Sequence, residues 1–266
     1  MWHNAATVHN IAVLRERGVT IVGPTTGQLT GSDSGPGRMA EPDDIVGAVL
    51  AVMEPQDLAG KSDLVTAGGT REPIDPVRFI GNRSSGKQGI AIAEAAAARG
   101  AEVTLIGANL DVSVPSTVTH VAVSSSAELA KAALAASPAA DIIIMTAAVA
   151  DYRPDTVSAE KLKKESQGDE LTLRLVKTED ILAALAESRR PGQVLIGFAA
   201  ETEPDDAALL ALGRAKIQRK GCDLLVVNRV GWSEGFGTDS NTVTVLDRAG
   251  DIVMEASGTK SSVAGR

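Results

Sequence analysis

The sequence has 266 residues, of which 44% are hydrophobic and 2% aromatic, and its formal net charge is −8. This length gives room for one domain of ordinary size plus a fragment, with enough apolar residues to form a core. The negative charge argues against nucleic acid as a partner, and the apolar runs are too short to span a membrane. With no signal segment at its start, the protein is expected to be cytoplasmic.

Residues 1 to about 60 are expected to be a fragment with too little core to fold by itself. The predicted elements are a helix around Asn10–Arg15, a strand at Val19–Val22, a loop from Gly27 to Pro42 rich in glycine and serine, and a helix from Asp43 to Met53. The residues from Glu54 to Lys61 have the composition of a linker. The predicted domain boundary therefore lies near residue 60.

From residue 61 onward strands alternate with helices, which predicts an α/β fold: a Rossmann-like, mainly parallel sheet flanked by helices, with a C-terminal β-hairpin extension. The predicted strands are Leu64–Thr66, Glu102–Gly107, His120–Val123, Asp141–Thr146, Leu171–Val176, Val194–Phe198 and Leu224–Asn228. The predicted helices are Lys87–Arg99, Ser126–Ala136, Glu179–Ser188, Asp205–Lys220 and a last one that starts near Ser262, and the hairpin joins Thr242–Asp247 to Asp251–Met254. The continuous apolar run after Asp141 predicts a central strand. The irregular stretch from Ala150 to Glu170 predicts a functional loop.

A long glycine-rich loop runs from Thr66 to Gly89, between the first strand and its helix. At the carboxyl end of a parallel strand, its backbone N–H groups and the helix N-terminus can bind a phosphate. The loop matches neither GxxxxGK[ST] nor GxGxxG, so the residues by themselves predict a phosphate-binding α/β domain and nothing more specific. The alternative is a plain crossover connection, although such connections are usually shorter.

This loop, with Gly68–Asp75 and Phe79–Gly89, resembles the N-terminal signature of bacterial phosphopantothenate-cysteine ligases. Further motifs follow in the family's order, which extends the resemblance over about residues 61–255: Ala147–Pro154, Glu160–Lys164, Gly197–Thr202, Lys216–Lys220 and Asn228. The resemblance implies a ligase domain over residues 61–266 that joins 4′-phosphopantothenate to L-cysteine in coenzyme A biosynthesis. CTP would convert the acid to an acyl-cytidylate with release of pyrophosphate. The amine of cysteine would then displace CMP to give 4′-phosphopantothenoylcysteine.

The resemblance also implies the residues of the site. Asn82 would stabilise the oxyanion of amide formation, Lys161 would neutralise charge on the reacting phosphate, and Asp151 would hold the nucleotide or a divalent ion, Mg²⁺ or Mn²⁺. The implied nucleotide-binding residues are Gly68, Gly69, Ser84, Ser85, Gly86, Met145, Thr146, Ala147, Asp151, Lys161, Glu179, Asp180, Ile181, Leu182, Phe198, Lys216 and Lys220. Each side chain with an assigned role has an ordinary alternative: a turn asparagine, a capping aspartate, a solvated run of lysines, or lysines that complement a helix dipole.

The first 60 residues resemble the C-terminal end of the flavin-dependent phosphopantothenoylcysteine decarboxylase, which many bacteria fuse ahead of the ligase. Met1–Trp2 would end its substrate-recognition motif, and Gly35–Met39 would belong to its flap. Gly31 stands where that family usually carries the flap cysteine, and FMN would bind only in the decarboxylase part that this sequence lacks. The resemblance therefore implies no decarboxylase activity. It also implies a homodimer of the ligase domain and a larger oligomer of the full fused protein.

Two other interpretations stay open from the sequence. One is an NAD(P)-dependent Rossmann oxidoreductase, against which stand the missing GxGxxG and the missing ribose-binding acid after the second strand. The other is a non-catalytic nucleotide-binding assembly module. Cys222 is predicted to be a small residue at a helix-to-strand junction and not a reactive thiol, and the three histidines, His3, His9 and His120, are expected to be packed or solvated.

Overall fold

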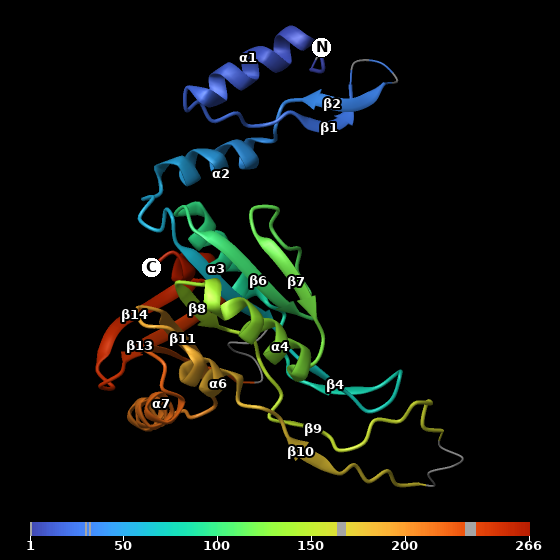
Figure 1. Cartoon of the computed structure of the whole chain (residues 1–266), viewed down its shortest axis with the longest axis vertical. Coiled ribbons are helices and arrows are strands. Elements are labelled where there is room, and N and C mark those ends of the chain that lie inside the picture. The colour runs from blue at the N-terminus through green and yellow to red at the C-terminus, as the bar shows by residue number, and fades with distance from the viewer. Residues whose placement is uncertain (1, 30, 32, 164–168, 232–237) are drawn as a thin grey trace. The chain divides into compact units, whose positions relative to one another are not determined.

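The computed structural model describes every residue except 1, 30, 32, 164–168 and 232–237, and only the backbone of residues 43, 50 and 51. The described residues form two compact units, Met1–Pro55 and Gln56–Arg266, and Figure 1 labels most of their elements. The role predicted for Met1 and the lysine at 164 lie outside the described residues.

The N-terminal unit contains two helices and one β-hairpin. They are α1 (Ala5–Glu16), β1 (Thr25–Gln28), β2 (Ser34–Arg38) and α2 (Pro42–Met53). Two predictions were wrong here: Val19–Val22 forms no strand, and the predicted loop after Gly27 contains the antiparallel pair of β1 and β2. The glycines and proline of β2 leave few side chains to mark it as a strand, because this hairpin is defined by its backbone pairing.

The C-terminal unit is built on an eight-stranded sheet with the order β14–β13–β12–β11–β8–β3–β6–β7. Its strands are β3 (Ser62–Gly68), β6 (Glu102–Ala108), β7 (Thr119–Val123), β8 (Ile142–Met145), β11 (Val194–Glu201), β12 (Leu224–Arg229), β13 (Ser240–Asp247) and β14 (Ile252–Thr259). The helices are α3 (Lys87–Ala98), α4 (Ser126–Ala136), the 3₁₀ turn η1 (Ser137–Ala139), α6 (Ile181–Ser188), α7 (Asp206–Lys220) and α8 (Lys260–Ala264). Two short antiparallel pairs lie outside the main sheet: β4 (Arg71–Pro73) with β5 (Phe79–Gly81), and β9 (Tyr152–Pro154) with β10 (Leu175–Lys177).

Six neighbouring strands of this sheet are parallel: β7, β6, β3, β8, β11 and β12. The hairpin of β13 and β14 continues the sheet in antiparallel pairing. The Rossmann-like α/β fold and its C-terminal β-hairpin are thus confirmed. The run after Asp141 is an interior strand, β8, flanked by β3 and β11 as its continuous apolar residues predict. The strand order reverses direction between β3 and β8, which is where ligands bind in sheets of this kind.

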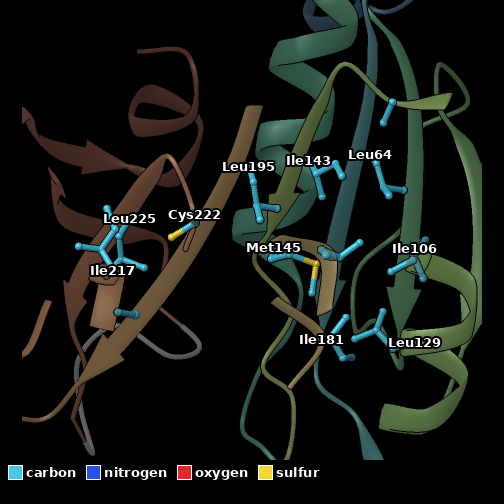
Figure 2. Close-up of a cluster of buried hydrophobic side chains, with 14 of the residues drawn as sticks. Leu64, Ile106, Leu129, Ile143, Met145, Ile181, Leu195, Ile217, Cys222 and Leu225 are labelled. Carbon is cyan, nitrogen blue, oxygen red and sulfur yellow. The ribbon is translucent and has the colours of Figure 1, made fainter. Parts of the chain in front are cut away.

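Two layers of apolar side chains hold helices against the two faces of the sheet. On one face Leu129 of α4, Ile181 of α6 and Ile217 of α7 pack with sheet residues such as Ile143 and Leu225, as Figure 2 shows. On the other face Ile90, Ala93 and Ala96 of α3 pack on Val65, Ala67, Val103 and Leu105. These layers fix the ends of the parallel strands, from which the loops of the site emerge.

Some element boundaries differ from prediction for identifiable reasons. Leu171–Val176 was predicted to be a strand of the parallel sheet, but the strand is Leu175–Lys177 and it pairs with β9 instead. Helix α6 begins at Ile181 and not at Glu179, because the side chain of Asp180 caps it by accepting from the N–H of Ala183 at 3.2 Å.

Cys222 lies between α7 and β12 and is buried, and burial raises the pKa of its thiol, as expected for an unreactive cysteine. His120 lies on β7, the edge strand of the sheet. None of the described helices combines the length and the apolar character that crossing a bilayer requires.

Candidate functional site

A cavity of about 960 Å³ lies at the carboxyl edge of the parallel sheet. Four strands contribute to its lining at or near their carboxyl ends, through Gly68 of β3, Met145 of β8, Phe198 of β11 and Asn228 of β12. Because β3 and β8 flank the reversal of strand order, the cavity occupies the position at which Rossmann-like sheets bind their ligands.

The glycine-rich loop is folded in conformations that require glycine. Gly68 has φ +86°, and a Cβ there would lie 2.0 Å from the carbonyl oxygen of Ala108. Gly86 has φ +83°, precedes α3 and provides no side-chain cap for the first N–H groups of that helix. The positive end of α3 is therefore open toward the cavity, which suits a phosphate or another anion.

Side-chain hydrogen bonds join this loop to the segment that follows β8. The hydroxyl oxygens of Thr66 and Thr70 accept from the N–H groups of Ala147 at 3.2 Å and Ala150 at 2.9 Å. The side-chain amide of Asn82 donates to the carbonyl oxygen of Val149 at 3.0 Å. The two loops, which are about 80 positions apart in the sequence, thus form one continuous wall of the site.

Another part of the lining carries lysines that are paired with carboxylates. Lys216 and Glu201 form an ion pair at 3.0 Å, and Lys220 is paired with Asp180. Burial acts to raise the pKa of Asp180, but the Lys220 ammonium and the N–H of Ala183 outweigh it and hold that pKa below its usual value. This part of the lining can therefore bind polar and charged groups of a ligand by exchanging one of its own pairs.

The structure brings nearly all of the predicted site residues together. The following line the cavity: Gly68, Asn82, Ser84, Ser85, Gly86, Met145, Thr146, Ala147, Asp151, Glu179, Asp180, Ile181, Leu182, Phe198, Lys216 and Lys220. Gly69 does not line it, because its N–H is directed to the carbonyl oxygen of Ala108 at 2.9 Å. Lys161 does not line it either: it is exposed, on the segment between β9 and β10 that extends away from the sheet in Figure 1.

The sequence did not single out several other residues that line the cavity. Lys87 stands inside the quoted loop motif, and Thr178 directly precedes the predicted stretch that starts at Glu179, so both were within reach of motif reasoning. Asn241 and Lys260 come from the C-terminal hairpin and the helix after it, and no pattern in the sequence connects them with a ligand.

The predicted metal site at Asp151 finds no support. This carboxylate is exposed at the cavity, and within the described part of the chain no three or more His, Cys, Asp or Glu side chains are grouped so that they could hold a metal ion.

Two families match the chain. Residues 58–266 match the family described as DNA/pantothenate metabolism flavoprotein C-terminal domain, and residues 1–54 match the family described as Flavoprotein. The chain is 48% identical over 277 residues to the coenzyme A biosynthesis bifunctional protein CoaBC of Mycobacterium tuberculosis, covering 100% of this chain and 66% of that protein. With the CoaBC of Escherichia coli the identity is 44% over 257 residues, covering 96% of this chain and 62% of that protein.

Two solved structures have the same fold. One is the C-terminal domain of coenzyme A biosynthesis bifunctional protein CoaBC, with 38% identity and a TM-score of 0.64 over 78% of this chain and 91% of that chain. The other is the DNA/pantothenate metabolism flavoprotein from Streptococcus pneumoniae, with 23% identity and a TM-score of 0.66 over 77% of this chain and 95% of that chain.

These matches correct the identity, activity and cofactors that the resemblance implied. Both family descriptions are those of flavoproteins, and none of the descriptions above names a ligase, CTP or a metal ion. The matching region is therefore the flavoprotein region of the coenzyme A biosynthesis proteins and not a CTP-dependent ligase. The cofactor that these descriptions indicate is a flavin, and not CTP together with Mg²⁺ or Mn²⁺. Flavoprotein descriptions span both parts of the chain, so the expectations that FMN belongs only to a missing part and that decarboxylase activity is absent are corrected as well.

The described side chains agree with a phosphorylated ligand but do not fit an isoalloxazine ring. In Met1–Pro55 the one buried side chain among those described is Ala40, which leaves no walls for a ring. In the large cavity the glycine-rich loop suits a phosphate, and the lining includes the charged side chains of Lys216 and Lys220. Flavins are held between apolar surfaces, whereas polar and charged residues are interspersed with the apolar ones in this lining.

The correspondence with the relatives concerns the fold, the pathway and the fused organisation. Coenzyme A biosynthesis and a bifunctional protein were both implied by the resemblance, and both appear in the names of the relatives. The chain spans 62–66% of the length of these two relatives. Since one family covers residues 58–266, well over half of the sequence, the chain belongs to the family of DNA/pantothenate metabolism flavoprotein C-terminal domains.

Proposed function

We propose that this chain acts in coenzyme A biosynthesis by binding a phosphorylated pantothenate derivative in the large cavity. The names of the relatives supply the pathway, and the family description supplies pantothenate as the chemical class. The observation that carries the proposal is the open, uncapped N-terminus of α3 at one end of a cavity that also offers hydrogen-bonding side chains such as Asn82 and Asn228.

A phosphopantothenoyl compound has a phosphate at one end and a chain of amide groups behind it. The phosphate would lie at Ser84, Ser85 and Gly86, where backbone N–H groups and hydroxyls can donate to its oxygens. The amides would lie along the wall formed by Asn82 and the residues after β8, which offers side-chain and backbone partners. A cavity of about 960 Å³ falls in the size range of small-molecule sites.

The predicted site residues enter the proposal as ligand-binding residues. Asn82 would hold a carbonyl oxygen of the ligand in exchange for that of Val149, and Lys216 and Lys220 would hold the carboxylate at the end opposite the phosphate in exchange for their own carboxylate partners. Lys161 would have to approach from the segment between β9 and β10, since it lies away from the cavity.

One compound of this class is the first probe to use. Cab2, a protein of similar fold with 19% identity and a TM-score of 0.62, is described in a complex with phosphopantothenate-cysteine. That likeness concerns the fold alone, so the compound is a choice of probe and carries no argument about the site.

The test is a calorimetric titration of the chain with 4′-phosphopantothenoylcysteine, its dephosphorylated form, FMN and CTP. The proposal expects the first to bind at least about tenfold more tightly than its dephosphorylated form, because charge-assisted hydrogen bonds to the phosphate are lost with that group. Tighter binding of FMN or of CTP than of the phosphopantothenoyl compound would refute the proposal, and so would the absence of any binding.

A cytoplasmic location, a homodimer and a larger assembly of the full-length protein also remain proposals, resting on the sequence. The homodimer is checked by light scattering: two chains of 27.3 kDa would give about twice the mass of one. A mass of one chain at all concentrations tested would exclude it. The predicted division at residue 60 likewise stays a prediction.

A further inference from the structure

A second cavity, of about 300 Å³, lies between α3 and the C-terminal segment. Its lining includes Lys87 of α3, Asp239, Thr259 and Lys260. Lys87 and Lys260 also line the large cavity, so both side chains stand where the two cavities adjoin.

Lys260 is buried, which is uncommon for a lysine: only 8% of the residue is exposed. It is the first residue of α8, and its ammonium donates to the carbonyl oxygen of Thr238 at 2.6 Å. Burial lowers the pKa of Lys260, and the positive charge of Lys87 lowers it further, while Asp239 acts in the opposite direction. Because both lysines line the same two cavities, the fold gathers two like charges at one place, an arrangement that a bound anion stabilises.

The described residues place two carboxylates at this cavity, Glu94 and Asp239, of which Asp239 is the one paired with Lys87. The carboxylate of Asp239 accepts from the ammonium of Lys87 at 2.6 Å, but its side chain is 87% exposed. An exposed ion pair is weak, because water screens it, so a stronger anion can replace this carboxylate at modest cost.

We propose that Lys87 and Lys260 form an anion site that holds the phosphate of the ligand, and that Asp239 occupies Lys87 while the ligand is absent. The inference rests on the proposed function and names the place of the phosphate within it. A phosphate monoester carries between one and two negative charges near neutral pH, and its oxygens can accept from both ammonium groups at once. The uncapped start of α3, at Gly86, adds N–H groups to the same place.

The C-terminal hairpin is joined to α3 beside this site. The side-chain amide of Asn241 donates to the side-chain oxygen of Gln88 at 3.1 Å, next to the pair of Lys87 and Asp239. The anion site is therefore assembled from the glycine-rich loop and from residues about 150 positions later in the chain. This gives the hairpin and α8 a role in ligand binding in addition to completing the sheet.

The inference is tested with Lys87→Gln, Lys260→Gln and Asp239→Asn, and with Lys131→Gln, an exposed lysine of α4, as the matched control. Each is titrated with 4′-phosphopantothenoylcysteine and with the dephosphorylated compound. Loss of either site lysine should reduce the preference for the phosphorylated compound about tenfold, since each contributes a charge-assisted hydrogen bond. Asp239→Asn should increase the affinity for the phosphorylated compound, because the competing carboxylate is gone, and the control should change nothing.

The outcomes separate the two proposals. If the unaltered chain prefers the phosphorylated compound and both lysine variants keep that preference, the anion site is wrong and the proposed function stands. If the unaltered chain binds neither compound, the proposed function itself fails. Lys260 is buried, so its variant is checked by circular dichroism, and Lys87→Gln carries the test independently. The exchange predicts tighter binding in Asp239→Asn, which mere loss of packing cannot produce. An unchanged affinity of this variant would therefore contradict the exchange.

Discussion

At the scale of single residues, the fold disfavours the ionised form of the Asp63 side chain. It is the second residue of β3, 3% exposed, at the end of the strand opposite the large cavity. Its Oδ1 atom is buried without a hydrogen-bond partner among the described residues. Burial, followed by the negative charge of Asp141, raises the pKa of Asp63 to about 6, against a smaller opposite effect of Arg99.

Asp63→Asn should therefore stabilise the protein in a pH-dependent way. Because its pKa in the folded state exceeds the ordinary value of 3.8, Asp63 costs nothing below that value, and the cost grows between pH 3.8 and about 6 and is constant above it. The free energy of unfolding should increase by about 1–3 kcal/mol at pH 7.5 and by about half as much at pH 5. Urea unfolding at the two pH values measures this, with the exposed Asp251→Asn as control. An equal gain at both would show that the charge of Asp63 is not its cause.

At the scale of elements, helix α3 lies very close to the sheet. Gly89, in its first turn, is buried, and a Cβ there would lie 2.5 Å from the Cβ of Ala67 and 2.5 Å from the hydroxyl oxygen of Thr146. The start of α3 can therefore reach the end of β3, where the proposed phosphate site lies, only with glycine at this position.

Gly89→Ala should force the start of α3 away from the sheet. The expected loss is about 1–3 kcal/mol in the free energy of unfolding, as for other overpacked core positions, together with weaker binding of 4′-phosphopantothenoylcysteine. The control is Gly47→Ala in α2, where the described residues place no atom of another part of the chain within 4 Å of the added Cβ, so the unfolding of residues 56–266 should not change. Unaltered stability of the Gly89 variant would show that α3 can shift at no cost.

A second element-scale feature is the anchor of the segment that carries Lys161. The buried carboxylate of Asp75 accepts from the N–H of Leu162 at 3.1 Å and from the side chain of Arg78, which in turn donates to the carbonyl oxygen of Leu162 at 2.6 Å. Burial favours the protonated form, but these hydrogen bonds and those from the N–H groups of Val77 and Arg78 hold the pKa of Asp75 well below its usual range. The anchor is thus fully present at pH values above the usual pKa of an aspartate. It is lost as the pH falls through the lowered pKa of Asp75 and the carboxylate becomes protonated.

Asp75→Asn removes one acceptor from this anchor. Backbone amides of residues 158–163 should then exchange hydrogen faster, because local opening of the segment becomes easier. Hydrogen exchange followed by mass spectrometry resolves this, with the amides of α6 as the internal reference. Exchange as slow as in the unaltered chain would mean that the segment is held by other contacts, such as the bond from the N–H of Ser158 to the carbonyl oxygen of Ile74.

The elements that sequence reasoning found and missed differ in what forms them. Strands such as β8 and helices such as α7 carry their own apolar or capping pattern, so they could be predicted within a few residues. The pairs β1–β2 and β9–β10 have no such pattern, because backbone pairing with a neighbour defines them and their side chains are mostly exposed. In the site, Lys216 and Lys220 belong to a recognisable motif, whereas Lys260 reaches the cavity only through the tertiary placement of the hairpin.

At the scale of the whole molecule, the site follows from the parallel sheet. The carboxyl ends of parallel strands share one edge, so residues as distant in sequence as Gly68 and Asn228 line one cavity. Most of the residues that the resemblance named line this cavity, but the activity that it named is wrong, because many residues at this edge serve any phosphorylated ligand. Only side chains that contact the distinguishing part of a ligand identify it, and motif spacing does not show which these are.

The two units also differ in what they can do alone. Every residue that lines the large cavity lies between Gly68 and Lys260, and the apolar layers on both faces of the sheet lie in the same unit, Gln56–Arg266. In Met1–Pro55 the described residues bury only Ala40, and the exposed Val46, Val49 and Met53 of α2 form no core within the unit. A core of this kind cannot offset the entropy of ordering a chain of that length.

A chain of residues 56–266 should therefore unfold cooperatively and bind 4′-phosphopantothenoylcysteine within about twofold of the affinity of the full sequence, since distant and independent sites contribute additively. Residues 1–55 alone should show no cooperative transition in thermal unfolding. Calorimetric titration and circular dichroism of the two pieces measure both quantities. A loss of affinity well beyond this range in the longer piece would show that the site needs residues of the first unit, and the assignment of ligand binding to the sheet edge alone would then be wrong.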